Sequence, residues 1–167
     1  AVGDIADKMI ENISNKAESL KVAPWTDSSA QMGPVISKEH KEKIENYIDL
    51  GVQEGAKLVL DGRNLKIQGY ENGYFVGPTL FDHVTDNMDI YKKEIFGPVL
   101  STVRTENYEE ALSLIIENEY GNGTAIFTRD GDTARDFANR INVGMVGVNV
   151  PIPVPVAYHT FGGWKKS

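Results

Sequence analysis

Helical and strand-like patterns alternate along residues 107–150, NYEEALSLIIENEYGNGTAIFTRDGDTARDFANRINVGMVGVNV. Asn107 and Glu110 have the spacing of a capping pair, and apolar residues then recur at helical spacing. A second helical pattern follows a predicted cap at Asp132. β-rich segments lie after the two helices, at 124–128 and 145–150. Strands separated by single helices are typical of crossover connections, so this stretch predicts an α/β fold with a mostly parallel sheet.

The preceding residues extend the same pattern. Two further helices are predicted, one after a cap at Ser37 and one with an apolar face formed by Ile5, Met9, Ile13, Ala17 and Leu20. Further strands are predicted at 57–60, 74–81 and 99–104, with loops at 24–33 and 68–73. No internal repeat or linker divides the 167 residues, a length that suits one domain.

Composition argues against several classes of function. The net charge of −7 and the scattered basic residues disfavour a nucleic-acid or anionic-membrane surface, and no apolar run has membrane-spanning length. The three histidines are far apart in sequence, so no metal site is predicted. The chain has no cysteine, which excludes disulfides and a thiol nucleophile within it and is compatible with a reducing cytoplasm. Phosphate-binding glycine motifs are also absent, so no dinucleotide pyrophosphate site is predicted in these residues.

One candidate ligand site is the stretch KKEIFGPVL at residues 92–100. The Gly-Pro pair predicts that Glu94 and Phe96 lie in a turn that leads into a strand. Turns at strand ends are where α/β proteins commonly hold ligands. From the residues alone, the simpler interpretation of Glu94 is a solvated carboxylate beside Lys92 and Lys93, an ion pair of little energetic value.

The terminal stretch VNVPIPVPVAYHTFGGWKKS, residues 148–167, alternates proline with apolar residues. Each proline removes an N–H donor and favours extended geometry before it, so the run cannot be a central strand. A cover over a sheet edge is the interpretation that physics alone favours. One wall of a substrate tunnel is the alternative.

Several of these segments together resemble the aldehyde dehydrogenase superfamily. They are GPVIS (33–37), GYFVGPTLF (73–81), EIFGPVL (94–100), YGNGTAIFTRDGDTAR (120–135) and the ending from Gly144. The ending is similar to the CoA-dependent methylmalonate-semialdehyde dehydrogenase branch. The resemblance implies that residues 1–167 are a single partial catalytic domain of three layers, a mostly parallel sheet flanked by helices. It also implies that the cofactor-binding domain, the nucleophile segment and the C-terminal tail lie outside this chain.

The resemblance further implies a reaction and roles in it. In such enzymes a cysteine thiolate attacks the aldehyde, hydride passes to NAD, and coenzyme A releases the acyl group. Methylmalonate or malonate semialdehyde would thereby give propionyl-CoA or acetyl-CoA with loss of CO2. Glu94 would hydrogen-bond the ribose next to nicotinamide, Phe96 would pack near the nicotinamide, and Asn149 and Phe161 would lie on the substrate side. No catalytic residue and no metal ligand is assigned within the chain, which is therefore expected to be inactive alone.

The expected partners are a small aldehyde and, for the parent protein, further copies of itself as a dimer or tetramer in the cytoplasm. Two alternatives stay open: a fragment of a hydrolytic NAD(P)-dependent aldehyde dehydrogenase, and a non-catalytic binding or scaffold module of the same fold. One departure from the family is Glu119, where proline is usual, which puts the local geometry of a helix exit in question.

Overall fold

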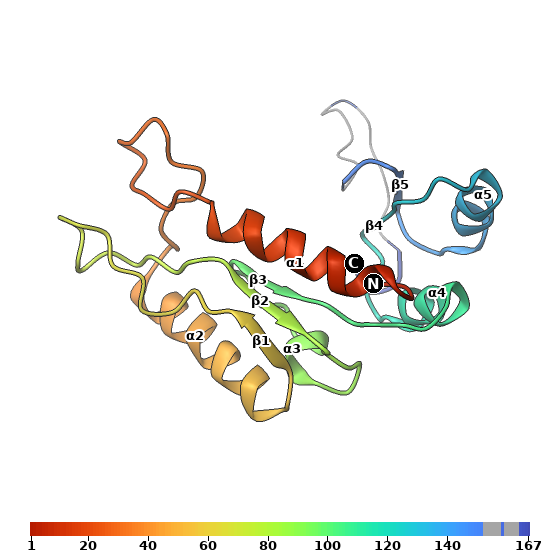
Figure 1. Ribbon diagram of the computed structural model, residues 1–167, viewed down its shortest axis with the longest axis horizontal. Helices are drawn as coiled ribbons and strands as arrows, with labels where there is room; N and C mark the ends of the chain where they lie inside the picture. Colours follow the sequence, from red (N-terminus) through yellow and green to blue (C-terminus); the bar gives the residue numbers. More distant parts are fainter. Residues whose placement is uncertain (152–157, 159–163) are drawn as a thin grey trace. The chain divides into compact units, whose positions relative to one another are not determined.

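The computed structural model describes residues 1–151, 158 and 164–167, whose helices and strands are labelled in Figure 1. The chain falls into two compact units, Ala1–Glu106 and Asn107–Ser167. Phe161, one of the two residues expected on the substrate side, lies outside the described residues.

The first unit contains a three-stranded sheet. β1 (Lys57–Leu60) pairs antiparallel with β2 (Thr79–Asp82), and β2 pairs parallel with β3 (Val99–Ser101). All four residues of the central strand β2 are buried, as expected for a strand whose two faces are both covered by helices.

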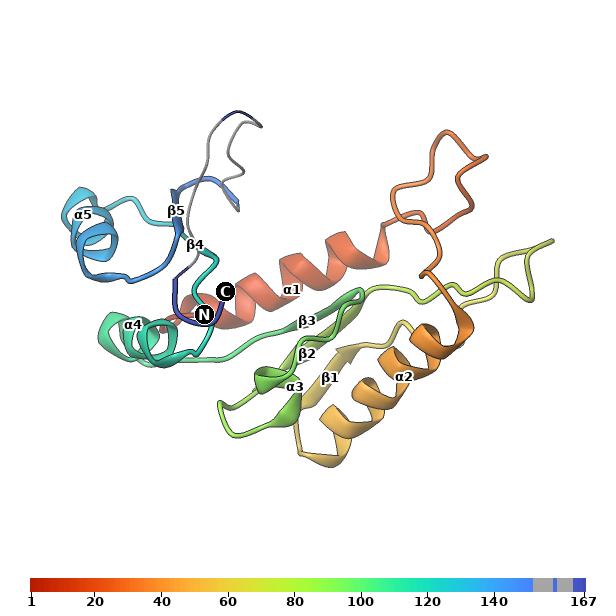
Figure 2. The ribbon, with the colours of Figure 1, turned by 180° about the vertical axis from the view of Figure 1, so that it is seen from behind.

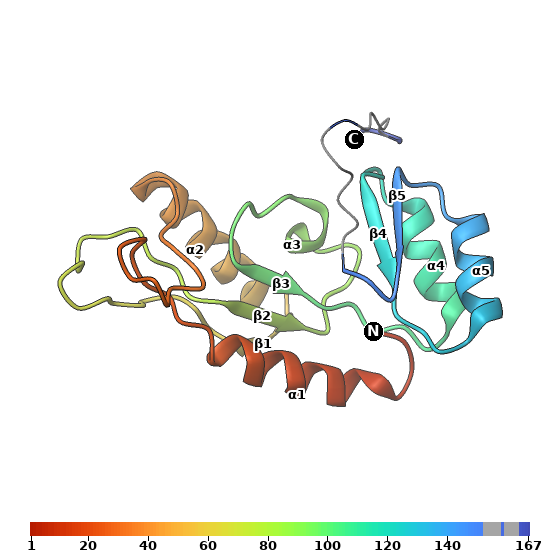
Figure 3. The same cartoon turned by 90° about the horizontal axis from the view of Figure 1, so that it is seen from above.

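Helices cover both faces of this sheet, which gives the first unit three layers (Figure 3). α1 (Ile5–Glu18) lies on one face, and α2 (Lys38–Gln53) and the short α3 (Asp89–Lys92) lie on the other. α2 runs beside β1 (Figure 2). The core between α2, α3 and the sheet includes these buried residues: Ile44, Ile48, Ala56, Val76, Phe81, Val84, Met88 and Ile90.

Two strands of the first unit are shorter than their patterns predict. The strand expected from Tyr74 begins only at Thr79, because Pro78 offers no N–H and the backbone before it crosses another segment. Gly77 N donates to Gly62 O at 2.8 Å, and a Cβ atom on Gly62 would lie 1.9 Å from the carbonyl oxygen of Gly77. The prediction was also wrong for 99–104, because β3 ends at Ser101. Ser101 pairs with Phe81, and β2 ends at the next residue, Asp82, before the backbone turns at His83, whose φ is 55°.

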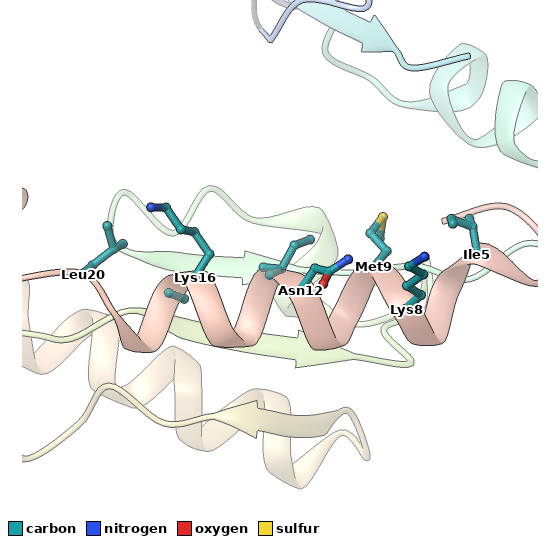
Figure 4. Close-up of a pocket in the computed structure, with 8 residues that line it drawn as sticks. Ile5, Lys8, Met9, Asn12, Lys16 and Leu20 are labelled. Carbon is teal, nitrogen blue, oxygen red and sulfur yellow. The ribbon is translucent and has the colours of Figure 1, made fainter. Parts of the chain in front are cut away.

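The apolar face predicted for α1 is only partly buried. Ala6 and Ile10 are the buried residues of the helix, whereas Ile5 is 54% exposed. The predicted stripe borders an open hollow of about 510 Å³ along the helix (Figure 4). Lys8, Asn12 and Lys16 also line it, and it holds no carboxylate, imidazole or hydroxyl group. It therefore offers no convergent set of groups for chemistry.

The second unit is built from two parallel strands and two helices. Its elements follow in the order α4 (Tyr108–Glu117), β4 (Gly123–Ile126), α5 (Gly131–Arg140) and β5 (Met145–Val148). β4 and β5 pair parallel, which confirms the connection predicted from the alternation of helix and strand. Both helices lie on the same face of the strand pair (Figure 3). The buried residues between them are Leu112, Phe137, Ile141 and Val143.

Helix caps follow the sequence at two of three positions. The side chain of Ser37 accepts from His40 N at 3.1 Å, and that of Asn107 accepts from Glu110 N at 3.0 Å. The prediction of Asp132 as the cap of α5 was wrong, because Asp130 Oδ1 accepts from Thr133 N at 2.6 Å. The helix thus begins two residues earlier than expected, with Gly131 in its first turn.

Candidate functional site

The loop formed by residues 93–98 connects α3 to β3, as the Gly-Pro pair predicts. It borders a hollow of about 280 Å³. The hollow is lined by Ile90, Lys93, Glu94, Ile95, Phe96, Gly97, Val99 and Ser101. Glu94 and Phe96, the two residues expected to bind a cofactor, thus share one surface depression.

Glu94 presents an exposed carboxylate with no hydrogen bond or ion pair to any residue that the structure describes. The two neighbouring lysines bind elsewhere. Lys93 Nζ lies 2.6 Å from Asp89 Oδ2, and Lys92 Nζ donates to Asn87 O at 2.8 Å. The hydrogen bond that Lys93 donates to Asp89 raises the pKa of Lys93. Both oxygens of Glu94 are therefore free to accept hydrogen bonds from a ligand.

Phe96 exposes its ring while its backbone is held. The side chain is 76% exposed, and the backbone carbonyl accepts a hydrogen bond from His40 Nε2 at 2.6 Å. The two rings meet edge to face with centroids 6.4 Å apart. The next residue, Gly97, lies against the core: a Cβ atom there would be 2.6 Å from Ile44 Cδ1. An exposed aromatic ring on a tethered backbone is suited to packing against a flat ligand.

Asn149, expected on the substrate side, belongs to the second unit and follows β5. Its φ of 57° lies in the left-handed region, which asparagine tolerates better than most residues. Thr128 N donates to Asn149 Oδ1 at 2.9 Å, and Asn149 Nδ2 donates to Thr128 O at 2.9 Å. The side-chain amide thus continues the pairing between the two strands past their ends. It fixes the backbone just after β5, and its role towards a substrate stays a prediction. Residues 152–157, which make up most of the proline-rich run, lie outside the described residues.

Lys165, near the end of the chain, forms an anchor that no sequence pattern predicted. Lys165 Nζ donates to three backbone carbonyls at the end of α4, those of Ile115, Ile116 and Asn118, at 2.8–2.9 Å. A cation there satisfies carbonyls that have no partner within the helix. Glu119, the residue that departs from the family pattern, forms an ion pair with Lys166. The altered helix exit is therefore bonded to the chain terminus.

A buried ion pair was also missed. Asp82 has a fully buried side chain at the end of β2, and it accepts from Arg104 Nε at 2.9 Å and Nη2 at 2.6 Å. His83 N donates to the same carboxylate at 2.8 Å. The bonds from Arg104 hold the pKa of Asp82 below its ordinary value. Because its oxygens are occupied and buried, this carboxylate has a structural role.

Among the residues that the structure describes, no group of three or more His, Asp or Glu side chains is placed to hold a metal ion. In the same residues, no helix is long and apolar enough to cross a membrane.

Comparison with known proteins places this geometry in context. Residues 2–167 match the model of the aldehyde dehydrogenase family. Malonate-semialdehyde dehydrogenase of Pseudomonas aeruginosa is 55% identical over 167 residues, which cover 99% of this chain and 34% of that protein. The mitochondrial methylmalonate-semialdehyde/malonate-semialdehyde dehydrogenase [acylating] of Bos taurus is 48% identical over 162 residues, or 97% of this chain and 30% of that protein.

A solved structure shows the same fold. It is a Sinorhizobium meliloti protein assigned as methylmalonate-semialdehyde dehydrogenase and crystallised with NAD. It superposes with a TM-score of 0.95 at 64% identity, over 98% of this chain and 34% of that one. The chain spans about a third of the length of the relatives that it matches.

Proposed function

The chain belongs to the aldehyde dehydrogenase family, and from this premise we propose that it supplies the ribose-binding carboxylate of an NAD-dependent semialdehyde dehydrogenase. The α/β fold expected for part of such an enzyme is confirmed by the superposition with its solved relatives. The exposed and unpaired carboxylate of Glu94, beside the exposed ring of Phe96, is the observation that supports the proposal most directly.

The residues of the 93–98 loop fit the nucleoside part of NAD. A carboxylate with two free oxygens can accept from the two neighbouring hydroxyls of a ribose, in bonds that its charge strengthens. The phenyl ring of Phe96 offers an apolar face to a flat heterocycle. When bound, NAD supplies a carbon that accepts hydride from the aldehyde carbon. The contribution of Glu94 and Phe96 is to hold that carbon in place, which lowers the entropic cost of the transfer.

We also propose the substrate and the acyl acceptor. The bacterial and bovine relatives are named for malonate or methylmalonate semialdehyde, and the bovine name includes the word acylating. We infer that the whole protein oxidises such a semialdehyde to acetyl-CoA or propionyl-CoA with loss of CO2, with coenzyme A as acceptor. The chain contains no cysteine, so the thiol that such chemistry uses would come from residues outside these 167. A homo-oligomer in the cytoplasm, and a single partial catalytic domain for this chain, complete the proposal.

Glu94→Gln tests the role of the carboxylate in the complete gene product. Gln keeps the shape but loses the charge, so we expect the KM for NAD to rise by about 10-fold, the value of one weakened charge-assisted hydrogen bond. Asp86→Asn removes an exposed carboxylate without described partners and is the matched control. An unchanged KM for NAD in Glu94→Gln would contradict the proposed cofactor role.

Two assays test the rest. The complete gene product should form acetyl-CoA from malonate semialdehyde only when coenzyme A is present. Acid formation that ignores coenzyme A would instead support a hydrolytic aldehyde dehydrogenase. The 167-residue chain alone should give no turnover with NAD, coenzyme A and malonate semialdehyde, and robust turnover would refute the assignment of the thiol to other residues.

A further inference from the structure

Helix α2 holds the 93–98 loop at two points on one side of the helix. His40 and Ile44 are four residues apart, so their side chains project from successive turns of the same face. His40 Nε2 bonds the carbonyl of Phe96, and Ile44 packs under Gly97, where there is no room for a Cβ atom. The loop is thus tethered by a hydrogen bond and seated by a packing contact at adjacent residues.

The tether is well defined in its chemistry. A backbone carbonyl only accepts, so His40 carries its proton on Nε2, and both the neutral ring with that tautomer and the charged ring can donate. The backbone of His40 is itself fixed, because its N–H donates to the cap residue Ser37 at 3.1 Å. The ring is half-buried and lies with its edge against the Phe96 ring. A short bond between residues 56 apart in sequence therefore determines the position of a loop that is otherwise exposed.

We propose that His40 is a positioning residue for nicotinamide cofactor binding, a role that rests on the proposed function of Glu94 and Phe96. His40 touches neither substrate nor cofactor in this proposal. It holds the carbonyl two residues after Glu94, and thereby restricts the directions in which the carboxylate and the phenyl ring point. A loop that is ordered before binding loses less conformational entropy when the ligand arrives. Removal of the tether should therefore weaken the binding of NAD without affecting the binding of the aldehyde.

The first experiment measures the loop itself. Amide hydrogen exchange in residues 94–99 of the chain is compared among wild type, His40→Ala, His40→Gln and Lys43→Ala. Exchange should accelerate about fivefold in His40→Ala, as expected for the loss of one neutral hydrogen bond. Gln can donate from its side-chain amide and should restore part of the protection. Lys43 is exposed on the same helix and serves as the control. Unchanged exchange in His40→Ala would overturn the inference whatever the enzyme does.

The second experiment measures binding in the complete gene product. His40→Ala should raise the KM for NAD several-fold and leave the KM for malonate semialdehyde and the melting temperature near those of Lys43→Ala. His40→Gln should lie between it and wild type. A general loss of stability would move both KM values and would not be rescued selectively by Gln.

The outcomes separate this inference from the function on which it rests. If Glu94→Gln raises the KM for NAD and His40→Ala does not, the positioning role is refuted and the proposed function stands. If Glu94→Gln leaves the KM for NAD unchanged, the proposed function is refuted, and so is the role of His40 in cofactor binding.

Discussion

Gly97→Ala should destabilise the first unit by a steric clash with Ile44. The backbone of Gly97 does not lie in the left-handed region, so alanine can adopt its conformation without strain. The added Cβ atom would meet Ile44 Cδ1 at 2.6 Å, Cγ1 at 2.8 Å and Cγ2 at 3.3 Å. Carbon atoms in ordinary contact are about 3.5–4.0 Å apart, so the overlap approaches about 1 Å.

The cost follows from where Ile44 lies. Its side chain is 1% exposed and belongs to the main core cluster, so it has little room to move aside. Overpacking of this kind costs about 1–3 kcal/mol, and we expect about 2 kcal/mol for Gly97→Ala. Ile44→Ala removes all three overlapping carbons and should by itself cost about 3.5 kcal/mol.

The double variant, which combines Gly97→Ala with Ile44→Ala, distinguishes a steric clash from a general effect on the loop. In Ile44→Ala the new methyl group at position 97 enters space that the isoleucine has left, so it should cost about 0 kcal/mol there. The double variant should then be about 3.5 kcal/mol less stable than wild type, instead of the about 5.5 kcal/mol that additive effects would give.

The free energy of unfolding of the first unit is measured for each variant by urea unfolding and by the exchange of the most protected amides of α2 and β2. Agreement of the double variant with the additive value, to within about 0.5 kcal/mol, would refute the contact between Gly97 and Ile44 as the cause.

Two further predictions concern the charged groups. Asp82→Asn should cost about 3 kcal/mol at neutral pH, because it leaves Arg104 without its buried partner. Since folding lowers the pKa of Asp82 from 3.8, this stabilisation is complete above that value and is lost as the pH falls through the lower pKa of the folded state. Urea unfolding from neutral to acid pH should therefore show that the difference in free energy of unfolding between wild type and Asp82→Asn becomes smaller in acid. A difference that does not change with pH would contradict the stabilising role of the ionised Asp82 carboxylate. Lys165→Met should lose about 1 kcal/mol from the end of α4, which would be seen as faster amide exchange at Asn118. Lys166→Met breaks only the exposed pair with Glu119 and should accelerate that exchange much less. Equal effects of the two variants would argue against the carbonyl contacts of Lys165.

Local patterns carried the prediction of the second unit. The spacing of apolar residues in α4 and α5 and the short β-rich segments between them depend on neighbouring residues alone. A strand, a single helix and another strand can form a compact unit most simply with the strands parallel, and the pairing of β4 with β5 confirms this. The cap of α5 was misplaced because Asp130 and Asp132 both stand at its start, and the choice between them depends on the backbone angle at each.

Strand ends in the first unit could not be predicted in this way. Residues 74–78 have the composition of a strand, yet the structure gives them single backbone hydrogen bonds instead of a strand ladder: Tyr74 O accepts from Val35 N, and Gly77 N donates to Gly62 O where the two segments cross. Likewise, α1 has a broad stripe of apolar residues, and sequence spacing does not tell which part of the stripe the sheet covers.

Local sequence patterns predicted four of the five helices that the structure describes, all but the short α3, together with the parallel pairing of β4 and β5 and the Glu94–Phe96 motif, because each of these follows from residues close together in the chain. Only the tertiary structure showed that both lysines beside Glu94 are bonded elsewhere, and that His40 and Ile44 hold the loop from more than fifty residues upstream. Contacts of that range arise when whole elements pack, and no local pattern records which side chain of a helix will meet a distant carbonyl.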